Sequence, residues 1–127
     1  MDDFMNTTAK KISVLGTDYT IRFVESGQDE YMDRMNYGGL CDGDSHEIFI
    51  LLLKTCKEWE KDPDEKIEAK QREIIRHELV HAFLNESGLR YNSLPTDGAW
   101  AKNEEMVDWF AIQFPKMLKA FQQADAL

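Results

Sequence analysis

Five consecutive residues, His77-Glu78-Leu79-Val80-His81, carry the side chains with the clearest chemistry in this chain. On an α-helix, residues four apart lie one turn above each other on the same face, so both imidazoles can reach one metal ion. Glu78, beside the first histidine, then lies within reach of a water molecule on that metal and can act as a general base. The spacing therefore predicts a zinc site with its own proton acceptor.

The residues around this motif are mostly apolar, which predicts that this turn of the helix is buried. They are Ile74, Ile75, Leu79, Val80, Ala82, Phe83 and Leu84. Buried imidazole and carboxylate groups need hydrogen bonds or a metal ion. The alternative interpretation is two core histidines bonded to carbonyl groups, with Glu78 turned to solvent. The complete motif inside an apolar run favours the metal site.

Catalytic zinc takes three protein ligands and leaves one position for water, so the motif alone is one ligand short. The chain has three histidines, and the third, His46, precedes the motif. A downstream carboxylate or a cysteine must therefore complete the site. Glu104 and Asp108 lie four residues apart, on one face of an expected helix. One carboxylate there could bind the metal and another could accept the Nδ1–H of a ligand histidine. A solvated acidic face is the alternative interpretation.

The first half of the chain predicts a small β-sheet. Residues 11–25 alternate apolar and polar side chains around Gly16-Thr17-Asp18, which predicts a β-hairpin. Residues 26–45 are polar and rich in glycine, so a loop is expected there, with a short helix around Asp29–Met35. A third strand is expected at His46–Leu53, where it could offer an open edge to an extended peptide.

The second half predicts two helices. One begins after Pro63 and runs to Ser87, and the other runs from near Trp100 to about Gln123. Pro115 should kink or split the second helix, because its ring removes the hydrogen bond back to residue 111. Three strands followed by two helices predict an α+β fold, in which a small three-stranded sheet packs on the helical half that carries the histidine motif.

Composition limits the classes of partner. The 127 residues are 43% hydrophobic, which indicates a single globular domain over 1–127. With 15 basic and 24 acidic residues, the net charge of −9 argues against nucleic acid or an anionic membrane as the main partner. We find neither a signal-peptide pattern nor a membrane-spanning apolar run, and Cys41 and Cys56 form no disulfide framework. These features predict a cytoplasmic protein with reduced thiols.

Two motifs together resemble a known group of enzymes. The pentapeptide is followed by Asn-Glu-x-x-x-Asp at 103–108, whose Glu104 stands 23 residues after His81; this arrangement resembles the gluzincin metallopeptidases, the group that includes thermolysin. The run 104–111 is similar to the E-x-x-A-N-x-F-A helix of the small ImmA/IrrE-type peptidases of bacteria and their mobile elements. Val107 and Asp108 stand where that pattern has Ala and Asn. The chain also resembles short phage or prophage proteins of this kind.

The resemblance implies that His77, His81 and Glu104 bind one zinc ion per chain. It also implies that Glu78 is the general base and that Asp108 orients a ligand histidine. The activity it implies is zinc-dependent hydrolysis of peptide bonds in a protein or peptide substrate, with a repressor protein as one candidate.

Peptide hydrolysis needs a further hydrogen-bond donor for the oxyanion. The candidates are Tyr91, which follows the zinc helix and is placed first, then Tyr37 and His46; for each, ordinary packing is the alternative.

Two rival functions belong to other classes. One is an inactive zinc-stabilised binding protein of phage or prophage origin. The other is a metal-free interaction protein that uses an aromatic C-terminal helix, with Trp109, Phe110, Phe114 and Phe121.

Overall fold

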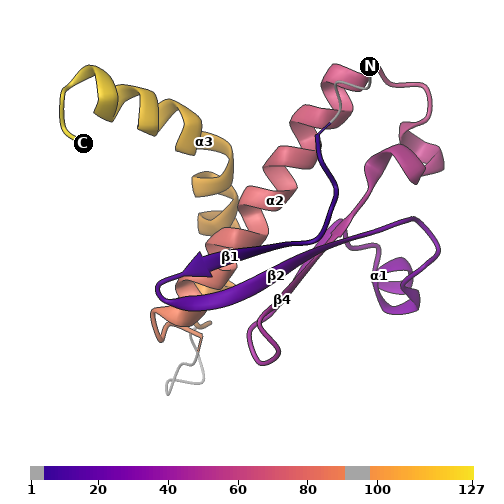
Figure 1. Ribbon diagram of the computed structural model, residues 1–127, viewed down its shortest axis with the longest axis horizontal. Helices are drawn as coiled ribbons and strands as arrows, with labels where there is room; N and C mark the ends of the chain where they lie inside the picture. Colours follow the sequence, from indigo (N-terminus) through magenta and orange to yellow (C-terminus); the bar gives the residue numbers. More distant parts are fainter. Residues whose placement is uncertain (1–4, 91–97) are drawn as a thin grey trace.

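The computed structural model describes residues 5–90 and 98–127 as an α+β fold (Figure 1). The strands are β1 Lys10–Val14, β2 Thr17–Val24, β3 Gly39–Asp42 and β4 Glu47–Leu51, and the α-helices are α1 Glu30–Met35, α2 Asp64–Glu86 and α3 Glu104–Gln123. The four strands form one mixed sheet in the order β1-β2-β4-β3. The expected α+β class is confirmed, whereas the expected number of strands, three, is wrong.

The hairpin of β1 and β2 confirms the expectation from the alternating pattern, since the two strands pair antiparallel. Its turn consists of Leu15 and Gly16, both at positive φ, 51° and 89°. Positive φ at both central residues is what a two-residue type I′ turn requires. Thr17 and Asp18, expected in the turn, already belong to β2.

β3 occupies part of the stretch that was expected to be a loop, so that expectation is wrong for Gly39–Asp42. The strand pairs antiparallel with β4. The connection between them is held by Asp42, whose Oδ1 accepts hydrogen bonds from the backbone N–H groups of Asp44 (2.9 Å) and Ser45 (3.2 Å). Gly39 does not interrupt the strand. Because it has no side chain, it allows the strand backbone to approach α2 closely. The short helix expected nearby is confirmed by α1.

β4 lies inside the sheet, parallel to β2 and antiparallel to β3. The strand expected at His46–Leu53 is therefore confirmed, with the narrower bounds Glu47–Leu51. Both of its edges are hydrogen-bonded to neighbouring strands, so the expectation of an open edge there is wrong. The edges of the sheet belong to β1 and β3, and β3 is the edge that lies beside the candidate site.

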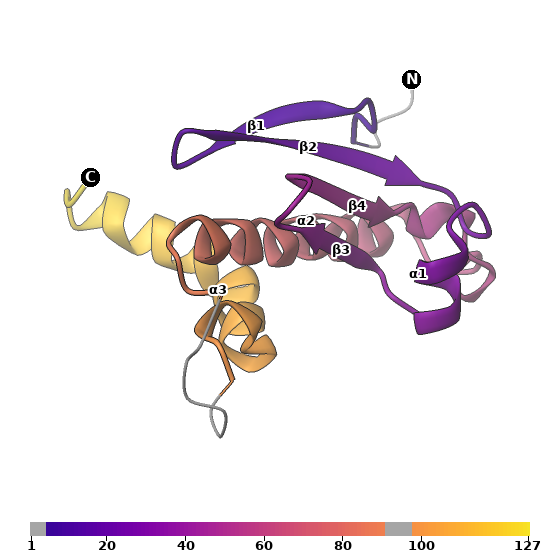
Figure 2. The same ribbon diagram turned by 90° about the horizontal axis from the view of Figure 1, so that it is seen from below.

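α2 packs along one face of the sheet, as Figure 2 shows. The shared core consists of Val14, Tyr19, Ile21, Ile48, Ile50 and Ala82, each no more than 2% exposed. Burying one such isoleucine side chain stabilises the fold by roughly 1.5–3 kcal/mol. Gln71 of α2 is fully buried; its amide donates to the Leu51 carbonyl (2.9 Å) and accepts from the Leu53 N–H (3.0 Å). These contacts fix the helix against the end of β4.

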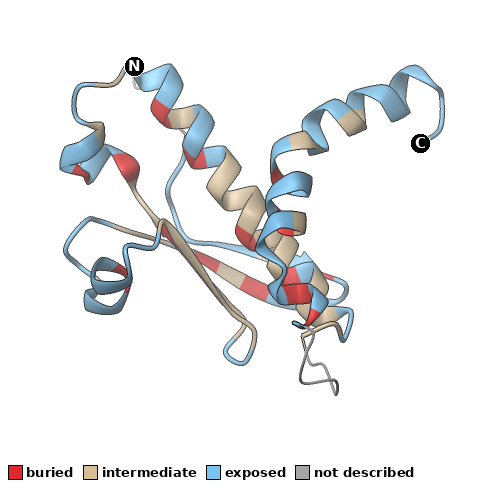
Figure 3. Ribbon diagram, turned by 180° about the vertical axis from the view of Figure 1, so that it is seen from behind, coloured by how far each residue is buried: buried red, intermediate tan, exposed pale blue. Residues whose placement is uncertain are grey.

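α3 crosses α2 and then extends beyond it. Asn103 caps the helix, since its side chain accepts a hydrogen bond from the Met106 N–H at 3.0 Å. The helix runs through Pro115 without splitting, and Figures 1 and 3 show it changing direction part-way along. After Ala111 it buries no residue, and Phe114 and Phe121 are exposed (Figure 3). None of the described helices is long and apolar enough to cross a membrane.

Candidate metal site

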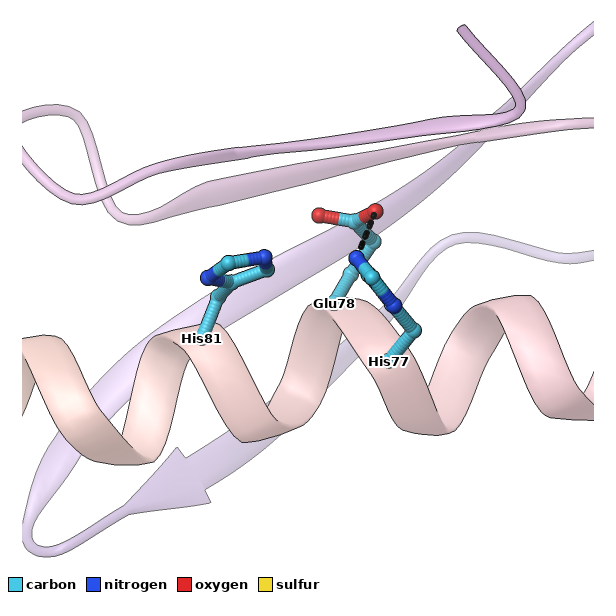
Figure 4. A group of neighbouring side chains, drawn as sticks. All are labelled: His77, Glu78 and His81. Carbon is cyan, nitrogen blue, oxygen red and sulfur yellow. Dashed lines mark ion pairs between the residues drawn. The ribbon is translucent and has the colours of Figure 1, made fainter. Parts of the chain in front are cut away.

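The motif side chains extend from one side of α2, as Figure 4 shows for His77, Glu78 and His81. One potential ligand atom from each lies within 4.8 Å of the others. The two imidazole rings stand edge to face, with their centroids 4.9 Å apart. The three residues form a group that could hold a metal ion, and four-residue helical spacing is the local reason for it.

Each imidazole is oriented by a contact at its Nδ1 atom. His77 Nδ1 lies 2.7 Å from Asp108 Oδ1, and His81 Nδ1 lies 2.6 Å from the carbonyl oxygen of Ala101. A carbonyl or an ionised carboxylate can only accept a hydrogen bond, so both Nδ1 atoms carry the proton. In the neutral rings the lone pairs of the two Nε2 atoms are then left for a metal ion.

α3 brings the carboxylate of Glu104 to both of these Nε2 atoms. Its Oε2 lies 3.2 Å from His77 Nε2 and its Oε1 lies 2.7 Å from His81 Nε2. Ligand bonds of about 2.0–2.2 Å in a tetrahedral zinc site imply ligand atoms roughly 3.3 Å apart. The two separations, made by different oxygens of one exposed carboxylate, lie near that spacing. The donor set of two imidazoles and one carboxylate therefore fits zinc.

Glu78 is the buried charged group of the site, with 6% of its surface exposed. Burial raises the pKa of its carboxyl to about 7, His77 lowers the pKa, and the negative charges of Glu104 and Asp108 raise it further. The Glu78 Oε2 atom lies 3.8 Å from His77 Nε2. A carboxyl with a pKa near neutrality can both take up and release a proton, which is what acid–base catalysis requires.

A cavity of about 1210 Å³ opens over this group. Its walls include β3 on one side and α2 on the other, with aromatic side chains and basic side chains among the lining residues: Tyr31, Tyr37, Trp59, Lys70, Arg90 and Lys102. Such a volume is somewhat above the range of roughly 300–1,000 Å³ that is typical of small-molecule sites. The side chains of His77, Glu78 and His81 thus lie in a cleft that has room for a bound molecule.

The sequence-based candidates for the oxyanion donor fall in three different places. Tyr37 lines the cavity. His46 does not: its Nε2 lies 3.7 Å from a Glu86 oxygen, and its ring is tilted against the ring of Tyr19, with the centroids 5.2 Å apart. Tyr91 lies outside the described residues. Among the described candidates, the cavity therefore favours Tyr37.

The cysteines offer the other class of ligand that the sequence left open. Cys41 lines the cavity, but burial raises the pKa of its thiol to about 12, and the charge of Glu78 raises it further. Cys56 does not line this cavity; it is buried, with its Sγ 3.6 Å from the Leu52 carbonyl. Both are free cysteines. The group in contact with both imidazoles is the Glu104 carboxylate.

Two parts of the site carry no signal in a sequence motif. The Ala101 carbonyl belongs to a short 3₁₀ helix, Trp100–Lys102, which is tied down by the hydrogen bond from the Ala101 N–H to the Leu89 carbonyl (2.9 Å). A backbone acceptor leaves no mark in residue types. Gly39 is the second part. The sequence predicted a loop there, whereas the structure shows a strand whose backbone lies against Glu78.

Comparison with known proteins adds no relative, since no family model, no curated protein and no solved structure matches this chain.

Proposed function

We propose that this protein is a zinc-dependent peptidase, with His77, His81 and Glu104 as zinc ligands and Glu78 as general base. The observation that carries the proposal is the position of Glu104. A carboxylate from α3 meets both Nε2 atoms of a two-histidine motif on α2, at 3.2 and 2.7 Å. Three ligands that converge from one side leave a fourth position toward the cavity, as catalytic zinc requires.

Zinc in this site would supply Lewis-acid chemistry, which acidifies water and polarises a carbonyl group. Glu78 accepts the proton of the attacking water and later donates it to the leaving nitrogen. Asp108 and the Ala101 carbonyl keep the two histidine rings in the orientation that presents Nε2. Tyr37, which lines the cavity, is the described candidate for donating a hydrogen bond to the oxyanion.

The substrate in this proposal is an extended peptide segment. β3 is an edge strand beside the metal group, and its free backbone groups can pair with an added strand. A folded protein would present such a segment as an exposed loop or terminus. A repressor protein with such a loop is one candidate.

Metal content and cleavage test the proposal. Elemental analysis of protein purified without chelator should give about one zinc per chain, and the His77→Ala and Glu104→Ala variants should lose it. Glu78→Gln should keep the zinc and lose cleavage of a peptide library read by mass spectrometry. Metal-free wild-type protein would contradict the zinc site. Zinc with no cleavage, or biological activity that Glu78→Gln leaves intact, would instead favour a zinc-stabilised binding protein.

A further inference from the structure

Gly39 lies where a side chain would collide with the proposed general base. A Cβ atom at this position would stand 2.8 Å from both Cγ and Oε2 of Glu78, closer than real Cβ contacts allow. Gly39 does not have the positive φ that makes glycine necessary at Gly16, Gly27 and Gly88. The backbone conformation at Gly39 thus admits any residue, and the space is what excludes a side chain.

The strand cannot withdraw to make room. Gly39 stands opposite Ile50 in the β3–β4 ladder, and the neighbouring Gly38 carbonyl accepts the Leu51 N–H at 2.9 Å. β4 is held in turn by β2 on its other side. Because Ile50 is completely buried in the core, a shift of this ladder would disturb the core packing. A collision at Gly39 must therefore be relieved by Glu78.

Glu78 has few ways to move. The collision involves its Cγ atom, so the side chain must change χ1 and cannot simply bend its carboxylate away. On a helix, one of the three χ1 rotamers is rarely available because it clashes with the preceding turn. A change to the remaining rotamer would carry the carboxylate away from the place beside His77 that it occupies now.

We propose that Gly39 is a positioning residue for Glu78: the bare backbone of β3 is the wall that holds the carboxylate over the metal group. The packing part of this inference stands on the geometry alone. Its catalytic consequence rests on the proposed peptidase function. Gly39 acts through Glu78, so replacing it should matter only when Glu78 is present.

A double-mutant cycle on thermal unfolding tests the packing, in chelator so that metal binding does not contribute. Gly39→Ala should lower the Tm by about 5 °C in the wild-type background and by no more than about 1 °C in Glu78→Ala, which has no Cγ atom. Gly38→Ala is the matched control, because its Cβ would meet only the Ile74 side chain, with the terminal Cδ1 at 3.3 Å and Cγ1 at 4.0 Å. Its Tm shift should be the same in both backgrounds.

Equal Tm shifts for Gly39→Ala in the two backgrounds, or no shift in either, would overturn the proposal. If Gly39→Ala alone does not fold, recovery of a folded protein in Gly39→Ala/Glu78→Ala supports it, and failure of the double variant to fold opposes it. These outcomes do not depend on whether the protein is a peptidase.

Hydrolysis gives the catalytic readout. Gly39→Ala should retain zinc and lose at least about 100-fold in kcat, because a misplacement of only about 1 Å can already cost that much. In the Glu78→Gln background the same change should lower the residual rate no further. A further loss there would show that Gly39 does not act through Glu78. If the wild type cleaves nothing, the peptidase proposal fails while the unfolding cycle still decides the packing.

Discussion

The guanidinium of Arg76 on α2 donates a hydrogen bond from Nε to the carbonyl oxygen of Ala111 on α3, at 2.6 Å. Ala111 is four residues before Pro115, which has no N–H to donate to that carbonyl. Arg76 therefore supplies the donor that proline removes, at a residue that is only 1% exposed. α3 also carries Glu104 and Asp108. The Arg76–Ala111 hydrogen bond therefore helps to hold these two carboxylates beside the histidines of α2.

Loss of the Arg76 donor should destabilise the fold. Arg76→Met keeps the aliphatic stem but leaves the Ala111 carbonyl unsatisfied, at a cost of about 1–3 kcal/mol in urea unfolding. In a Pro115→Ala background, the restored N–H of residue 115 can bond Ala111, so the cost of Arg76→Met should fall to near zero. An equal cost in both backgrounds would mean that Arg76 stabilises the protein by another route.

Removal of the Asp108 carboxylate should weaken zinc binding without abolishing it. Asp108→Ala frees the His77 ring to rotate, and loss of such an outer contact typically costs about 10–100-fold in metal affinity. Competition with a chromophoric chelator measures the change. Glu105→Ala, an exposed acidic neighbour on the same helix, is the control for net charge. If both variants bind zinc equally, charge rather than ring orientation explains the effect.

The buried Glu78 should make the stability of the metal-free protein depend on pH. Its folded pKa of about 7 exceeds the ordinary value of 4.5, so the folded state binds the proton more tightly than the unfolded chain. Stability from this group is fully present below about pH 4.5 and is lost as the pH rises through 7.

Glu78→Gln should therefore be more stable than metal-free wild type at pH 8, by up to about 3 kcal/mol, because the folded pKa of about 7 lies well above 4.5. The difference should become small as the pH falls to about 4.5 and should vanish below that value, where the glutamate is protonated in both states. Urea unfolding at several pH values in chelator checks this. A constant difference across the range would show that Glu78 stays ionised in the folded protein.

The position of Tyr37 predicts a catalytic effect that His46 should not share. Tyr37→Phe removes only a hydroxyl group, and it should lower kcat about 10²-fold if that hydroxyl stabilises the oxyanion, with zinc content unchanged. His46 has φ of +58°, which asparagine tolerates well, and it contacts Glu86 outside the cavity. His46→Asn should leave kcat unchanged. If His46→Asn lowers kcat and Tyr37→Phe does not, the oxyanion donor is His46, which lies in the turn between β3 and β4.

Much of the candidate site follows from local spacing. His77 and His81 converge because four residues make about one helical turn, and Glu104 and Asp108 share a face for the same reason. The hairpin follows similarly from the alternation of apolar and polar residues, and α2 and α3 follow from residues that begin and end helices. Such features depend on neighbours within one element, so the chain order alone predicts them.

The strand β3 was not predictable in this way. Four residues that include a glycine and an aspartate read as a loop, and only pairing with β4 and packing against α2 make them a strand. The parallel pairing of β2 with β4 likewise places β4 inside the sheet. Which strands pair depends on packing throughout the core, so local propensity does not predict the pairing partners.

By itself, the sequence identified the two histidines, the base between them and the acidic pair that could bind the metal or orient a histidine. The tertiary structure decided which atoms meet: Glu104 at both Nε2 atoms, the Ala101 carbonyl at His81, and the bare backbone of Gly39 against Glu78. These contacts join residues 20 to 39 positions apart in the chain. They arise when separate elements share one core, and no periodicity within a single element encodes them.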